Sequence, residues 1–120
     1  MADKADGRRV QALQRCAREY EDLKRQLQSL GYILQGSVTE RWNQCGRPWC
    51  HCHKDPQSRH GPYYQWSWKD RGKTKSVYLE ADQARQCREW IENHRALERL
   101  LKRLRMVSLR AARLCDIAGK

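Results

Sequence analysis

The sequence predicts an α+β fold, in which a small antiparallel β-module of about three strands lies between an N-terminal helix and a long C-terminal helix. Two observations predict it. Apolar residues recur with helical spacing near both ends of the chain, and this spacing is lost between residues 36 and 80, where glycine, proline and β-forming residues predominate. A length of 120 residues favours one domain, residues 1–120, with a modest hydrophobic core.

Residues 8–30 are predicted to form the first helix. Their apolar positions are separated alternately by three and four residues, which is the heptad pattern of a helix that pairs with another helix. Gly31 follows the last of these positions and is a natural helix stop. The predicted seam consists of Leu13, Cys16, Tyr20, Leu23, Leu27 and Leu30.

Residues 36–80 are predicted to form the β-module. A first strand is expected at residues 37–42, and residues 63–68 alternate as a second strand does. The turn residues 70–73 lead into a third strand at residues 75–79, which completes a hairpin. Four large aromatic residues are expected to form the core of this module: Trp42, Tyr64, Trp66 and Trp68.

Residues 81–118 are predicted to form one long helix with an acidic residue, Asp82, in its first turn. Two series of residues seven apart predict a second seam, which would pair with the first seam or form a homodimer. Their members are Cys87, His94, Leu101, Ser108 and Cys115, and, offset by three, Trp90, Leu97, Leu104, Ala111 and Ala118. On this interpretation the seam cysteines and His94 are packed side chains and not ligands.

A cluster of cysteines precedes the predicted hairpin. Three cysteines lie within eight residues, and seven residues separate the last of them from a histidine. Three thiolates and one imidazole complete the tetrahedral shell of a structural zinc ion, which would cross-link and stabilise the β-module. The expected ligands are Cys45, Cys50, Cys52 and His60.

The fourth ligand stays open between His60 and two histidines, His51 and His53, that lie beside a ligating cysteine, where simultaneous ligation is awkward. An iron–sulfur cluster would need a fourth cysteine nearby, so zinc is the better expectation. A closed shell leaves no position for water or substrate, and the glutamate of a deaminase signature is absent beside His60. We therefore expect no enzyme activity.

The chain carries a net charge of +11, which favours a polyanionic partner such as nucleic acid. No apolar run approaches the roughly 20 residues that cross a bilayer, and the first residues lack the apolar core of a signal peptide. We therefore expect a cytoplasmic location and no membrane partner. Clustered cysteines in such a compartment indicate metal binding more than disulfides.

Basic residues of the long helix are predicted to share one face, opposite the seam. From Arg99 to Arg113 there are six basic residues and no acidic residue, whereas a solvated face usually mixes charges of both signs. Aromatic residues beside cations can stack on bases, and Trp49, at the tip of the cysteine loop, is the best candidate for this. The predicted nucleic-acid-binding residues are Arg47, Trp49, Arg71, Lys73, Arg88, Arg95, Arg99, Lys102, Arg103, Arg110 and Arg113.

The order of several motifs resembles a family of small bacterial, archaeal and phage proteins that is classed as a domain of unknown function. These motifs are Cys-Gly-Arg-Pro-x-Cys-x-Cys, His-Gly-Pro-Tyr-Tyr, the hairpin strand ending Ser-Val-Tyr-Leu, and Trp-Ile-Glu-Asn in the charged helix. The resemblance covers residues 36 to 105, with Arg47 where lysine is frequent in the family. It implies that the four expected metal ligands belong to the defining motif, and it implies no activity. An association with mobile elements would fit.

Two functions are consistent with these features. The first is a zinc-stabilised accessory protein that binds DNA or RNA, for example in a mobile element or a phage. The alternative is a protein–protein interaction module that docks on a larger partner through its helices.

Overall fold

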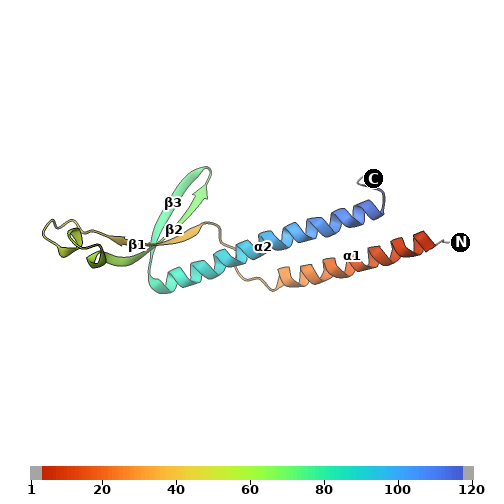
Figure 1. Cartoon of the computed structure of the whole chain (residues 1–120), viewed down its shortest axis with the longest axis horizontal. Helices are drawn as coiled ribbons and strands as arrows, with labels where there is room; N and C mark the ends of the chain where they lie inside the picture. Colours follow the sequence, from red (N-terminus) through yellow and green to blue (C-terminus); the bar gives the residue numbers. More distant parts are fainter. Residues whose placement is uncertain (1–3, 118–120) are drawn as a thin grey trace. The chain divides into compact units, whose positions relative to one another are not determined.

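The structure is a computed structural model that describes residues 4–117. Its elements, in chain order, are α1 (Lys4–Gln28), β1 (Ser37–Asn43), the short 3-10 helices η1 (His51–His53) and η2 (Pro56–Ser58), β2 (His60–Asp70), β3 (Lys73–Leu79) and α2 (Ala81–Leu114) (Figure 1). The α+β fold predicted from the sequence is confirmed: an N-terminal helix, a three-stranded antiparallel sheet and a long C-terminal helix.

The chain divides into two compact units, and the boundary falls within α2. The helical unit contains the residues up to Gly31 together with those from Arg95 onward, and the β unit is Tyr32–His94. The organisation as one domain stays a prediction. Among the described residues, no helix combines the length and the apolar character that crossing a membrane requires.

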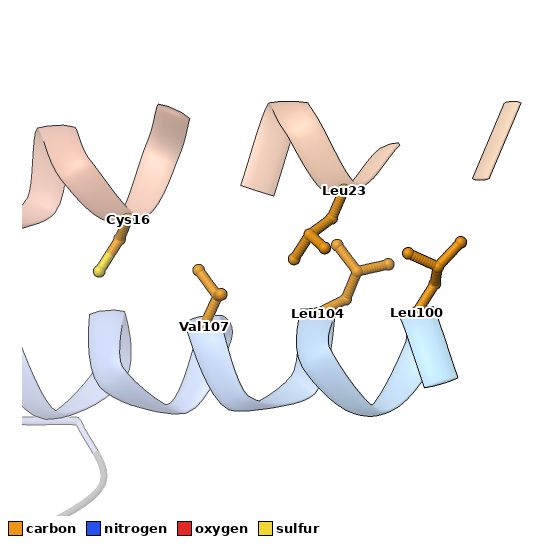
Figure 2. Close-up of a cluster of buried hydrophobic side chains, with 5 residues drawn as sticks. All are labelled: Cys16, Leu23, Leu100, Leu104 and Val107. Atoms are coloured by element: carbon orange, nitrogen blue, oxygen red, sulfur yellow. The ribbon is translucent and has the colours of Figure 1, made fainter. Parts of the chain in front are cut away.

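The helical unit is built on a row of apolar side chains between α1 and the second half of α2. Figure 2 shows Cys16 and Leu23 of α1 pointing toward side chains of α2. The antiparallel direction of the pair is evident from two ion pairs, Arg9 with Asp116 at 3.6 Å and Arg110 with Glu19. The buried members of this core are Cys16, Leu23, Leu100, Leu104 and Val107.

The first seam is confirmed, and the second seam is rotated from its predicted position. Every predicted seam residue of α1 is buried or half-buried. In α2 the core runs through Leu100, Leu104 and Val107, whereas Ser108 and Cys115 are exposed, so their predicted burial is wrong. On an ideal helix this is a rotation of about 60°, toward the side that offers large aliphatic residues in place of serine and cysteine. Ala118 lies outside the described residues.

The helix boundaries also differ from prediction. α1 begins at Lys4 and ends at Gln28, a few residues before the predicted limits at each end. α2 ends at Leu114, because Asp116 adopts a left-handed φ of 58°. The amide of Ile117 then donates to the carbonyl of Ala112 at 2.8 Å, which is the hydrogen bond of a Schellman motif and closes the helix.

In the β unit the sheet order is β1-β2-β3, and both pairings are antiparallel. Side chains alternate between the two faces of the sheet, so Tyr64, Trp66 and Trp68 of β2 share one face, which we call the inner face. The rings of Trp66 and Trp68 stack at 3.8 Å, and the guanidinium of Arg88 in α2 lies 5.6 Å from the ring centre of Tyr64. The inner face therefore packs toward the first half of α2, as the predicted aromatic core requires.

Two observations refine that core. Trp42, which the sequence predicts within it, is 50% exposed. Ala84 and Ile91 of α2 are buried at 1% and 4% exposure. The core of the β unit is therefore small, and its burial comes from α2 as well as from the aromatic strand.

Gly36 allows the chain to enter the sheet. It has a φ of +110°, a conformation that residues with a side chain rarely adopt, and a Cβ there would overlap the carbonyl oxygen of Ser67. The close approach lets the carbonyl of Gln35 accept a hydrogen bond from the indole of Trp66 at 2.9 Å. This contact fixes the start of β1 against the inner face.

Candidate metal centre

The predicted ligands come from three short segments of the β unit. Cys45 follows β1, Cys50 and Cys52 lie at η1, and His60 is the first residue of β2. The loop that joins the ends of β1 and β2 thus brings all four to one place, at the end of the sheet away from the β2–β3 turn (Figure 1). Their ligand atoms all lie within 4.8 Å of one another.

The distances within this group match a tetrahedral metal shell. The Sγ atoms of Cys45 and Cys52 are 3.6 Å apart, and Cys50 Sγ lies 3.3 Å from Nε2 of His60. Zinc bonds of about 2.3 Å to sulfur and about 2.0 Å to nitrogen place tetrahedral ligand atoms roughly 3.5 to 3.8 Å apart. The four residues could therefore hold a metal ion with little rearrangement.

Hydrogen bonds to sulfur favour the thiolate that a metal needs. The backbone amide of Cys52 and, after it, the ring of His60 lower the pKa of Cys50 to about 6. The amide of Cys45 lies 3.3 Å from Cys52 Sγ, a typical support for a ligating sulfur. Cys52 is only 1% exposed, and this burial raises its pKa, so its thiolate needs a neighbouring cation.

The positions of the histidines separate the three alternatives for the fourth ligand. Nε2 of His53 lies 2.8 Å from the carbonyl oxygen of Cys45, and Nε2 of His51 lies 3.8 Å from Asp55. Neither belongs to the group of ligand atoms, whereas His60 does. The geometry therefore favours His60 as the fourth ligand, whereas the ring of His53 contacts the backbone carbonyl of Cys45.

The loop is shaped by local hydrogen bonds and by one glycine. The amide of Cys50 donates to the carbonyl of Arg47 at 3.1 Å, which closes the turn that holds Pro48 and Trp49. After His60, Gly61 adopts a φ of +146°, and a Cβ there would lie 2.8 Å from the carbonyl oxygen of Arg41. The Gly-Pro that follows the histidine thus lets β2 pass close to β1 just beyond the site.

The predicted nucleic-acid-binding residues are divided between the two units. In the β unit, Arg47 and Trp49 are in the loop between β1 and β2 that carries the cysteines, which we call the metal loop. Arg71 and Lys73 are at the β2–β3 turn, and Arg88 is on α2. Trp49 is 77% exposed, as predicted for the tip of the loop. The helical unit carries the remaining six residues, all exposed on α2: Arg95, Arg99, Lys102, Arg103, Arg110 and Arg113.

Arg110 is engaged by the helix pair. Its guanidinium bonds to the carboxylate of Glu19 in α1, which raises the pKa of Arg110. The carboxylate of Glu19 therefore partly offsets the positive charge that Arg110 would present to an anionic ligand.

The second face of the sheet was not predicted as a candidate functional surface. Tyr63 and Tyr78 alternate with the inner-face residues, and they are 43% and 68% exposed. The alternation of side chains along this strand could have indicated this face, because Tyr63 precedes Tyr64 and cannot share its face. The predicted core included Trp42, Tyr64, Trp66 and Trp68, and no role was predicted for Tyr63 or Tyr78.

Fold and site together define a small protein in which a paired helical unit is joined to a β unit with a candidate metal centre. Residues 13–89 match the family model described as Domain of unknown function (DUF6788), and the chain belongs to this family. No curated protein and no solved structure matches the chain. The family's description assigns it no activity.

Proposed function

We propose that the chain is a zinc-stabilised nucleic-acid-binding accessory protein. The observation that carries this proposal is the charge of α2 from Arg99 to Arg113, where six basic residues and no acidic residue occur and all six are exposed. Of these six, Arg110 bonds to Glu19 of α1. A helix surface of one sign attracts a polyanion and repels like-charged partners. Membership in the family adds no evidence for or against this function.

Zinc is the metal that the donor set suits best. Three thiolates and an imidazole are soft and borderline ligands, which favour zinc over calcium or magnesium. Four protein ligands close the shell, so the metal would have a structural role and no open position for catalysis. The metal would hold the loop so that Arg47 and the exposed Trp49 project from it.

The test is a fluorescence anisotropy titration of labelled DNA and RNA oligonucleotides at fixed low salt. A triple variant of exposed α2 residues, Lys102→Gln, Arg103→Gln and Arg113→Gln, is expected to lower the affinity at least about tenfold. Its control must remove the same charge from the same unit without touching this surface.

The matched control is Arg9→Gln, Lys24→Gln and Arg25→Gln. These cations are paired with Asp116, Glu21 and Asp22 at exposed positions, where ion pairs contribute little to stability. The control is expected to lose less than about threefold in affinity. Equal losses in the two variants, or no binding by the wild type, would contradict the proposal.

The alternative function, docking on a protein partner through the helices, has one supporting observation. Met106 and Leu109 of α2 are 55% and 36% exposed. The two seams pack against each other within the chain, so a protein partner would use such outward residues. A partner whose binding is lost in Met106→Ser and unchanged in the basic triple variant would favour this alternative.

A further inference from the structure

The second face of the sheet, which we call the outer face, combines aromatic rings with basic and amide side chains. Its register places Tyr63 opposite Arg41 of β1 and Tyr78 of β3 opposite Gln65. A hydrogen bond of 2.9 Å between the hydroxyls of Ser67 and Ser76 shows that β2 and β3 share this face. Tyr78, at 68% exposure, is the most exposed ring on it.

A hollow opens at the end of this face nearest the metal loop. It has a volume of about 530 Å³, which lies within the roughly 300 to 1,000 Å³ of ligand pockets. Its apolar lining comes from Pro62 and from the outer-face residues Tyr63 and Tyr78, and Asn43 and Gln44 are its amide residues. Tyr64 and Leu79, which alternate to the inner face, complete the lining. Flat apolar walls with a few hydrogen-bonding groups are the setting that a nucleobase needs.

The carboxylates of the strands are confined to the inner face, where Lys73 and Lys75 also lie, so the outer face carries cations without carboxylates. Arg41 and Lys69 alternate onto the outer face, and the strand carboxylates Glu40 and Asp70 alternate onto the inner face. Asp70 is paired there with Lys75 at 2.8 Å. An anionic ligand with planar rings is therefore matched by the outer face in both shape and charge.

We propose that the outer face binds a single-stranded segment of nucleic acid. One unpaired base would enter the hollow and stack on Tyr78 or Tyr63, the amides of Asn43 and Gln44 would bond its edge, and Arg41 would contact a phosphate. A duplex cannot use this face, because its bases are already stacked on one another. The inference rests on the proposed nucleic-acid binding and names its substrate class.

The experiment compares single-stranded RNA and DNA 12-mers with a duplex of the same sequence, using the zinc-loaded full chain and fluorescence anisotropy. Tyr78→Ala is expected to weaken single-strand binding about 5- to 150-fold, the usual effect of losing one stacking ring, and Tyr78→Phe to stay within about twofold. The matched control is Val77→Ala, a neighbour on the inner face that is 42% exposed, and it is expected to leave binding unchanged.

A second measurement uses the wild type alone and so does not depend on a variant's folding. Single strands with 4-thiouracil are cross-linked by light, and adducts are expected on peptides containing Tyr63 or Tyr78. If the wild type binds oligonucleotides but Tyr78→Ala binds single strands equally well, or the adducts lie only on α2, the inference fails and the proposed function stands. Absence of binding at low salt overturns both.

Discussion

At the scale of single residues, the candidate metal centre depends on where one histidine ring lies. Three histidines are near the cysteine cluster in sequence, but only the ring nitrogen of His60 lies among the thiols, 3.3 Å from Cys50 Sγ. The cysteine spacing was sufficient to predict three ligands. It was insufficient to exclude His53, because the bond of that ring to the Cys45 carbonyl depends on how the loop closes.

The first prediction concerns these side chains. Freshly purified, reduced wild type is expected to contain about one zinc per chain, and Cys45→Ser or His60→Gln less than about a tenth, because a site that lacks one ligand competes poorly for metal. His53→Gln is the matched control, since its ring bonds a carbonyl, and it should retain the metal. Elemental analysis by mass spectrometry measures the ratio.

Loss of zinc in His53→Gln with retention in His60→Gln would contradict this ligand assignment. The same samples report on the role of the metal. If the site is structural, circular dichroism of Cys45→Ser should show loss of the β signal, because the loop gains its order from the metal.

At the scale of elements, the helical unit is held by the core between α1 and α2. Leu23 is 1% exposed in the midst of this core, facing Leu100 and Leu104 of α2 (Figure 2). Such a residue contributes through both burial and packing. The exposed ion pairs of the same unit contribute little by comparison.

The second prediction follows from this burial. Leu23→Ala is expected to lower the free energy of unfolding by about 2 to 5 kcal/mol, since it removes buried methyl groups and leaves a cavity. Leu109→Ala, the same change at a residue that is 36% exposed, should cost less than about 1 kcal/mol. Urea denaturation followed by circular dichroism measures both, and equal losses would show that α1 and α2 do not pack as described.

Sequence patterns predicted the elements better than the faces that they bury. The seam of α1 was predictable because its apolar residues offer one heptad pattern only. The helix α2 offers two overlapping patterns, and the one with Leu100 and Val107 buries more apolar surface than the one with Ser108 and Cys115. Which of the two patterns is buried depends on the side chains of the partner helix, and the periodicity of α2 alone gives no information about them.

The sheet shows the same limit. The hairpin and the first strand were predictable from alternation and turn residues, with strand ends a few residues short. Alternation also predicted the inner face, because Tyr64, Trp66 and Trp68 recur at every second residue. The exposure of Tyr63 and Tyr78 on the other face was not predictable, because it depends on whether another element covers them.

At the scale of the whole molecule, the net charge of +11 is shared by both units. Nucleic acid would be bound through cations on α2 and, if the outer face takes a single strand, also through the rings and cations of the β unit. Counterion release makes such binding strongly dependent on salt, whereas a protein interface of apolar residues depends on it weakly.

The salt dependence of oligonucleotide affinity therefore tests the central claim most directly. The zinc-loaded full chain is titrated with a labelled oligonucleotide at 50 mM and at 200 mM salt. If exposed cations bind phosphates, the affinity is expected to fall at least about tenfold over this range. Absence of binding at the lower concentration, or an affinity that salt does not change, would contradict nucleic-acid binding by this protein.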